Sequence, residues 1–70
     1  MNHEIYMANS SLLNAVGAAH GLHFSEDHGL PNIKDEIERV RYWVKQAEAY
    51  LTAYEASKVE AIQKATGGAV

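Results

Sequence analysis

The residues best suited to chemistry are three histidines, His20, His23 and His28, with the carboxylates of Glu26 and Asp27 among them. Imidazole and carboxylate groups are common ligands of zinc and nickel. Their spacing matches no known metal-binding motif, and a glycine next to His20 interrupts the segment, so a shared helical face cannot be assumed. We therefore expect loop histidines in contact with solvent, and neither a metal nor a cofactor.

The sequence lacks the residue sets on which common enzymatic mechanisms depend. It has no cysteine, no HExxH pattern and no glycine loop of the kind that cradles phosphate. Ser10, Ser11 and Ser25 have the character of cap and turn residues, and no spaced set of Ser, His and Asp accompanies them. The sequence predicts a protein that is not an enzyme.

Aromatic and arginine side chains between residues 39 and 54 are candidates for recognition of another protein, because Trp, Tyr and Arg are enriched among interface hot spots. Tyr42 is the strongest candidate, since it lies opposite the apolar side of its predicted helix. The predicted partner-binding residues are Tyr42, Arg39, Arg41, Trp43 and Tyr50. The alternative is that Trp43, Tyr50 and Tyr54 only widen a core or a dimer contact.

These residues must be positioned by a long helix that begins after Pro31, with Asn32 as its N-cap, and covers about residues 33–65. Its apolar positions alternate steps of four and three, which is a heptad pattern with one polar interruption at Lys58. The predicted dimer or core seam consists of Ile33, Ile37, Val40, Val44, Ala47, Leu51 and Tyr54.

A shorter amphipathic helix is predicted over residues 4–20, with Gly21 at the position that ends many helices. Residues 21–32 then form the connecting loop, and residues 66–70 form a frayed tail. The whole chain, 1–70, is predicted to be a single helical domain.

The expected fold is an all-α helical hairpin with a short first helix and a long second helix. The first helix would leave apolar surface uncovered near Leu51, Tyr54 and Ile62 of the second. A chain this short is marginal as an isolated folding unit. We therefore expect a homodimer, with either a four-helix or a coiled-coil-like arrangement.

The composition argues against several classes of partner. The formal net charge is -3, whereas nucleic-acid binding requires a basic surface. There is no apolar run of the roughly 20 residues that a membrane span requires, and no secretory signal pattern. These features predict a cytoplasmic protein with no direct contact to nucleic acid or membrane.

The sequence MNHEIYMANSSLLNAV, a glycine-containing loop and the long segment PNIKDEIERVRYWVKQAEAYL together resemble the small quorum-sensing anti-activators encoded by Pseudomonas phages. The resemblance is one of size and layout over nearly the whole chain. It implies a dimeric helical protein that binds a LuxR-type quorum-sensing activator in the host cytoplasm and keeps it off DNA. It also implies inhibition of the pilus assembly ATPase.

The expected function is therefore that of an inhibitor that binds a host regulatory protein. The alternative is a structural coiled-coil or self-assembly protein that has no regulator as its target.

Overall fold

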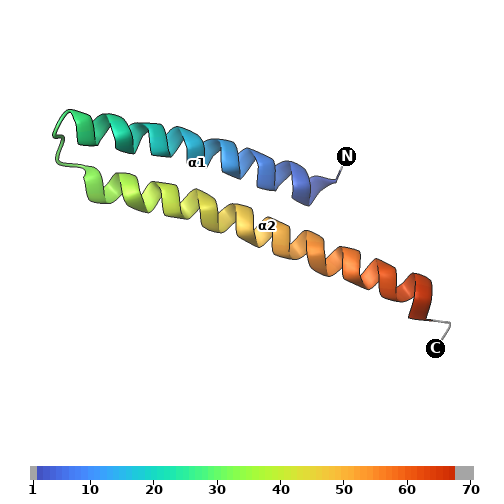
Figure 1. Ribbon diagram of the computed structural model, residues 1–70. Coiled ribbons are helices and arrows are strands. Elements are labelled where there is room, and N and C mark those ends of the chain that lie inside the picture. The colour runs from blue at the N-terminus through green and yellow to red at the C-terminus, as the bar shows by residue number, and fades with distance from the viewer. Residues whose placement is uncertain (1, 68–70) are drawn as a thin grey trace.

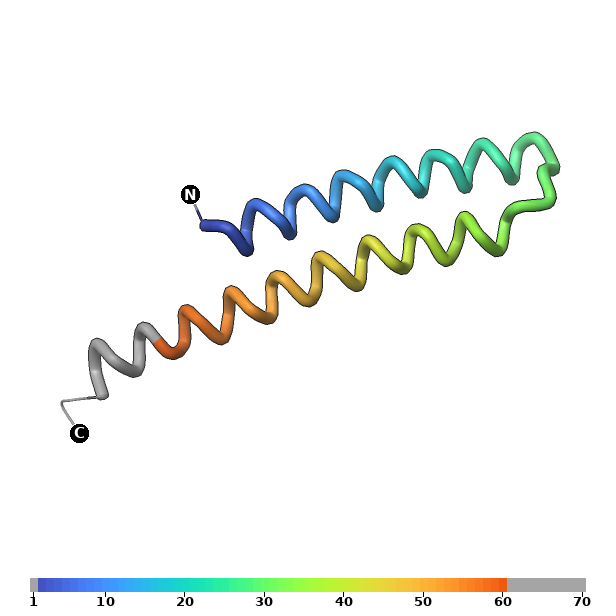
Figure 2. The backbone as a smooth tube through the Cα atoms, turned by 180° about the vertical axis from the view of Figure 1, so that it is seen from behind, coloured from blue at the N-terminus to red at the C-terminus, as the bar shows by residue number. Residues whose placement is uncertain are grey.

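The computed structural model describes the backbone of residues 2–67 and the side chains of residues 2–60. It contains two helices, α1 (His3–Asp27) and α2 (Ile33–Gly67). The helices run antiparallel and side by side as a hairpin, with the short connection at one end (Figure 1; Figure 2). The molecule is elongated, measuring 62 × 21 × 12 Å.

The N-terminal end of α1 is capped by Asn2. Its side-chain Oδ1 accepts a hydrogen bond of 3.0 Å from the backbone N–H of Ile5, and its carbonyl accepts one of 3.0 Å from the N–H of Tyr6. This satisfies a donor that the first turn of a helix otherwise leaves unpaired. The cap explains why the helix begins at His3.

The C-terminal end of α1 is set by Gly29, whose φ angle is +61°. The N–H of Leu30 donates to the carbonyl of Ser25 at 2.9 Å, and the N–H of Gly29 donates to that of Glu26 at 3.2 Å. This pair of bonds is the Schellman motif, which needs a left-handed residue that glycine provides at low cost. The connection between the helices is therefore only residues 28–32.

The prediction that Gly21 ends the first helix is wrong, and so is the prediction of a short first helix followed by a long second one. Helix α1 has 25 residues. Over the residues with described side chains, α2 has about 28. The two helices are therefore of similar length, and residues 21–27 belong to α1. The all-α hairpin itself is as expected, whereas dimerisation is not shown.

Helix α2 begins where the sequence predicts, directly after Asn32. The Asn32 carbonyl accepts the first helical hydrogen bond, from the N–H of Glu36 at 3.1 Å. Its side chain does not cap in the usual way, because Nδ2 donates to the Glu36 carboxylate at 3.2 Å. The predicted end at residue 65 lies two residues before the observed Gly67; of the predicted tail, residues 68–70 lie outside the described residues.

Small side chains line the side of α1 that faces α2. They recur in alternating steps of three and four, with one larger residue, half-buried Leu22, at the border between the seam and the flank: Ala8, Ser11, Ala15, Ala18, Leu22 and Ser25. The facing side of α2 has the same spacing with larger residues: Glu36, Val40, Trp43, Ala47, Tyr50 and Tyr54. The two rows form a seam in which α1 contributes little volume, so the helices can approach closely.

Gly21 fixes the register of this seam. A Cβ atom at Gly21 would lie 2.8 Å from Oε2 of Glu36, which is buried at 8% exposure. The glycine thus makes room for a carboxylate that α2 directs toward α1. Because both helices rise equally per residue, a register with Gly21 opposite Glu36 places Ala15 at the level of Tyr42 and Ala8 at the level of Ala49, each one residue from the seam residues Trp43 and Tyr50.

The predicted overhang of α2 beyond α1 is wrong at Tyr54, because His3, the first residue of α1, lies level with Tyr54 in the same register, and Tyr54 is half-buried. Apolar surface does remain uncovered at Leu51, as predicted, since Leu51 is 48% exposed. The side chain of Ile62, the third residue of that prediction, lies outside the described residues.

Candidate protein-binding surfaces

The hairpin buries little of the surface of its large apolar side chains. Within residues 2–60, the buried hydrophobic residues are all alanines, and no large side chain is fully buried. The large apolar residues are exposed or half-buried instead. A surface of this kind marks a site where a soluble protein meets another surface.

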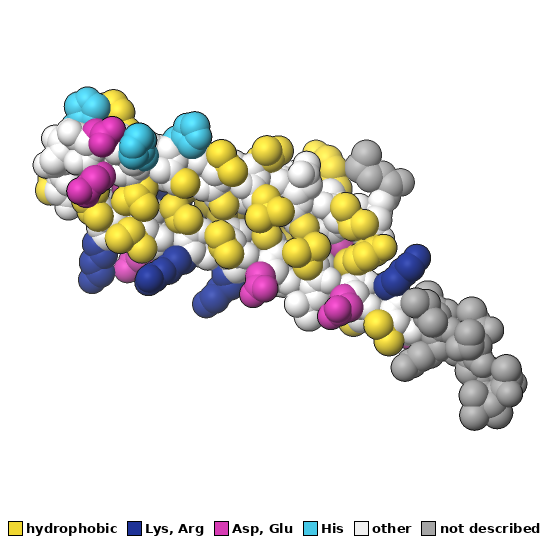
Figure 3. All heavy atoms as spheres, viewed as in Figure 1, with side chains coloured by type: hydrophobic (Ala, Val, Ile, Leu, Met, Phe, Trp, Pro, Cys, Tyr) yellow, Lys and Arg dark blue, Asp and Glu magenta, His cyan; other side chains and the backbone are white. Residues whose placement is uncertain are grey.

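One side of the hairpin carries most of these residues, and we call it the apolar face. It combines positions on the same flank of the seam in both helices: Ile5, Leu12, Val16, Ala19 and Leu22 from α1, and Ile33, Ile37, Val44 and Leu51 from α2. Figure 3 views this side and shows hydrophobic side chains in a band along both helices.

Near the connecting loop the apolar face is hollowed. Residues of both helices line this depression of about 430 Å³: Ala19, Leu22, His23, Glu26, Ile33 and Ile37. It confirms that these flanks of α1 and α2 meet on one side of the molecule. Its open, largely apolar form suits a side chain from another protein.

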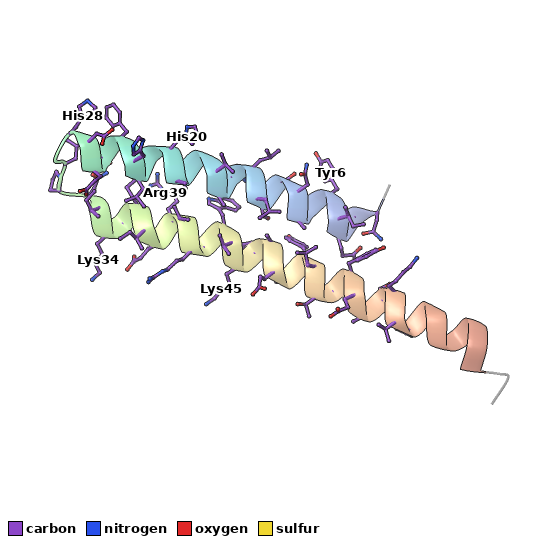
Figure 4. All side chains as sticks on the ribbon, viewed as in Figure 1. Tyr6, His20, His28, Lys34, Arg39 and Lys45 are labelled. Atoms are coloured by element: carbon purple, nitrogen blue, oxygen red, sulfur yellow. The ribbon has the colours of Figure 1, made fainter. Side chains whose placement is uncertain are left out.

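Charged residues border the apolar face along the outer edge of α2, and we call them the charged edge. They are Lys34, Arg41, Glu48 and Glu55, spaced by seven residues and all exposed. A seven-residue spacing places them in one line along the helix. Figure 4 shows Lys34 at the loop end of α2, and Lys45 farther along the helix, pointing away from α1. The two basic residues lie toward the loop and the two acidic ones toward the other end.

A second surface surrounds Tyr42. Glu38, Arg41, Tyr42 and Lys45 line a shallow hollow of about 260 Å³, which we call the Tyr42 depression. The Tyr42 ring is 54% exposed and contacts Trp43 edge-on, with ring centroids 5.0 Å apart at 79°. This aromatic geometry is favourable. Because Trp43 is half-buried in the seam, it restrains the exposed Tyr42 ring.

The other predicted partner-binding residues lie in different surroundings. Trp43 and Tyr50 are half-buried in the seam between the helices. Arg39 is 61% exposed and pairs with Glu36 across 3.8 Å, and Figure 4 shows it on the side of α2 toward α1. Among the five, only Arg41 and Tyr42 line the same depression.

The predicted seam of α2 divides between two surfaces. Val40, Ala47 and Tyr54 lie in the seam with α1, with Ala47 only 2% exposed. The remaining members, Ile33, Ile37, Val44 and Leu51, lie on the apolar face, and Val44 and Leu51 are nearly half exposed, at 45% and 48%. Sequence reasoning missed Glu36, whose charge concealed its place in the seam.

The histidines lie at the end of α1 near the loop and not in a long loop. His23 pairs with Asp27 at 3.5 Å. His28 stacks on Phe24, with ring centroids 4.0 Å apart, and its Nδ1 lies 2.9 Å from the Phe24 carbonyl. Figure 4 shows His20 and His28 on the side of α1 away from α2. Among the described residues, no group of three or more His, Cys, Asp or Glu is arranged to hold a metal ion.

Neither helix, over the described residues, is long and apolar enough to cross a membrane. No protein-family model, curated protein or solved structure matches this chain. The case for function therefore depends on the two surfaces, the apolar face and the Tyr42 depression.

Proposed function

We propose that this chain acts by binding another protein through the Tyr42 depression and thereby inhibits that protein. The observation that supports the proposal is the exposed Tyr42 ring held against half-buried Trp43. A restrained aromatic side chain loses little conformational freedom on binding, which favours affinity. Tyrosine, tryptophan and arginine are also the residues that contribute most to interface hot spots.

The charges around Tyr42 favour a partner with a mixed polar rim. Glu38 contributes a carboxylate, while Arg41 and Lys45 contribute two cations. Charged groups at such a rim mainly set the association rate and the choice of partner, and the aromatic anchor contributes most of the affinity. Arg39, on the neighbouring side of α2, extends the surface.

The resemblance to phage anti-activators supplies two candidate targets, a LuxR-type quorum-sensing activator and the pilus assembly ATPase. Binding to the activator would keep it off DNA by covering its DNA-contacting surface or by holding an inactive form. The net charge of -3 disfavours a mechanism in which this chain itself binds the DNA in place of the activator. The alternative from another class is a self-assembly protein with no regulator as its target.

The test is calorimetric titration of the purified protein into each candidate target, beside a pull-down from Pseudomonas lysate with identification of the captured proteins. Tyr42→Ala is the key variant. We expect it to weaken binding by about 2 kcal/mol or more, as for a hot-spot residue. Arg39→Ala should weaken binding by less, because Arg39 has an ion-pair partner within its own chain.

Tyr6→Ala is the matched control, since Tyr6 is 53% exposed and Tyr42 is 54% exposed. Tyr6 lies near the start of α1, far from the loop end (Figure 4). Binding that is unchanged in Tyr42→Ala, or equally reduced in both variants, would contradict the assignment. A protein that captures only its own copies would favour the self-assembly alternative.

A further inference from the structure

The Tyr42 depression has more positive than negative charge in its lining. Arg41 and Lys45 are both exposed and lie on either side of Tyr42 in the sequence. Figure 4 shows Lys45 directed away from α1. Glu38 is the one carboxylate that lines the depression within the part of the chain that has described side chains. Two cations and one anion therefore surround the exposed Tyr42 ring.

The two cations of the depression take part in no ion pair with a described side chain. The salt bridges between described side chains join His23 to Asp27 and Arg39 to Glu36. Glu38 lies three residues before Arg41, a spacing at which side chains on a helix can pair, yet these two do not. The positive charge of the depression is therefore available to a group from outside the chain.

Arg41 and Lys45 also repel each other. They lie four residues apart on α2, a spacing that places both on the same side of a helix, and like charges at that spacing destabilise the helix. An anion placed between them would replace this repulsion by two attractions. Sequence choices that oppose local stability in this way are expected at functional surfaces.

The Tyr42 hydroxyl is a further polar group that is available for binding. It forms no hydrogen bond with the described part of the chain. A phenol O–H can donate to a carboxylate, and a hydrogen bond to a charged acceptor is stronger than one between neutral groups. Because Trp43 holds the Tyr42 ring edge-on, the hydroxyl is held close to the two cations.

We propose that the Tyr42 depression binds an acidic side chain, Asp or Glu, of the partner protein. The carboxylate lies between the Arg41 guanidinium and the Lys45 ammonium and accepts a hydrogen bond from the Tyr42 hydroxyl. The hollow of about 260 Å³ has room for one such side chain. This inference rests on the proposed function and specifies the chemistry of the partner at that site.

A basic side chain of the partner is the less favourable occupant. It could pair with Glu38, but it would then lie close to both Arg41 and Lys45. Two repulsions would accompany one attraction. Because like charges brought together at an interface cost binding free energy, the lining of the depression favours an anionic occupant.

An acidic counterpart also separates the two modes of inhibition of a DNA-binding activator. A surface that contacts DNA must be basic, because it neutralises phosphate groups. A surface that presents a carboxylate to the Tyr42 depression therefore lies outside the DNA-contacting surface. Inhibition of such an activator would then follow from holding an inactive form.

The first test removes single charges and measures the dissociation constant for the captured target by calorimetry. Lys45→Gln should weaken binding about threefold to fivefold, as expected for the loss of one exposed ion pair. Glu38→Gln should strengthen binding by about twofold, because the incoming carboxylate loses a repelling neighbour. Lys34→Gln is the matched control, since Lys34 is an exposed lysine about three turns earlier in α2, and it should leave binding unchanged.

The opposite signs at Glu38 and Lys45 are the decisive result. Weaker binding by Glu38→Gln together with stronger binding by Lys45→Gln would mean that the counterpart is basic, and it would overturn the proposal. Equal effects of Lys45→Gln and Lys34→Gln would also overturn it, because the contribution of Lys45 would then be no more than that of a distant charge.

The second test is a charge exchange with the target. The double variant Arg41→Glu with Lys45→Glu should weaken binding on the order of a hundredfold, because two attractions become repulsions. Acidic surface residues of the target are then changed to Lys one at a time. One of these changes should restore binding to the double variant while weakening binding to the wild-type chain. If none of them does so, no acidic residue of the target occupies the depression.

Tyr42→Ala separates this inference from the proposed function. If no target is captured, or if Tyr42→Ala leaves binding unchanged, the proposed function fails and the inference fails with it. If Tyr42→Ala weakens binding but the charge variants do not act as expected, the proposed function stands and only the acidic counterpart is excluded. Thermal unfolding of each variant should match the wild type, because the substituted side chains are exposed.

Discussion

The side of α1 that faces α2 and the remaining sides of α1 differ in the size and the burial of their apolar residues. The side that faces α2 is made of small residues such as Ala8, Ala15 and Ala18, which are no more than 7% exposed. The opposite and flanking sides carry Ile5, Leu12, Leu13 and Val16, which are 45% to 64% exposed. The comparison shows that close approach of two backbones and burial of large apolar groups are separate sources of stability, and that this hairpin uses mainly the first.

The largest effect should come from enlarging a residue in the seam. Ala47→Leu adds volume at a position that is 2% exposed and should force the helices apart, lowering the free energy of unfolding by about 1–3 kcal/mol. Ala49→Leu is the control, since Ala49 is exposed and its replacement should change stability by less than about 0.5 kcal/mol. Urea unfolding at a fixed protein concentration measures both; equal effects would show that the seam is loosely packed.

An intermediate effect is expected from two glycines of α1. Gly17→Ala should stabilise the protein by about 0.5–1 kcal/mol, because alanine favours the helix and no atom lies within 4 Å of the added Cβ. Gly21→Ala should raise the free energy of unfolding by less than Gly17→Ala does, or should lower it, because the added Cβ would lie 2.8 Å from Oε2 of Glu36. Thermal unfolding of the two variants checks this difference, and an equal gain in both would mean that Glu36 moves away freely.

The smallest effect is expected at Leu13, which is the most exposed large apolar residue within residues 2–60. Leu13→Ala should change the free energy of unfolding by less than about 0.5 kcal/mol, because the side chain borders neither the seam nor the apolar face. A loss above 1 kcal/mol in urea unfolding would reveal a second covered surface on α1.

The sequence predicted the helical hairpin and the start of α2 because both have strong local signals. The apolar periodicity of residues 33–54 and the Pro31-Asn32 pair mark the second helix without help from tertiary contacts. The end of α1 was misplaced because two glycines compete for it. Gly29 is followed by Leu30 and Pro31, which is a pattern typical of a helix terminus. Gly21 is followed by residues that are themselves helical, so it matches a terminus less well.

The split of the predicted α2 seam between the contact with α1 and the apolar face was harder to predict from the sequence. Heptad spacing identifies a stripe, yet α2 has two adjacent apolar stripes, one through Trp43 and Tyr50 and one through Val44 and Leu51. Which of them faces α1 depends on the small residues of α1, whose alanines and serines give a weak hydrophobic signal. Arg41 and Tyr42 were singled out from the sequence, because an aromatic residue on a polar helix side is visible in sequence alone, and the structure places both in one depression. Their role in binding stays a prediction.

The tight turn at Gly29 also has a consequence for the order of folding. Contacts near the turn, such as that of Gly21 with Glu36, join residues that are close in the chain, so closing the loop between them costs little entropy. Contacts near Ala8 and Tyr50 join residues that are far apart in the chain, so they cost little loop-closure entropy only after the helices are already aligned. The hairpin should therefore close from Gly29 outward, and the first turns of α1 should exchange their amide hydrogens fastest among the helical residues near the seam.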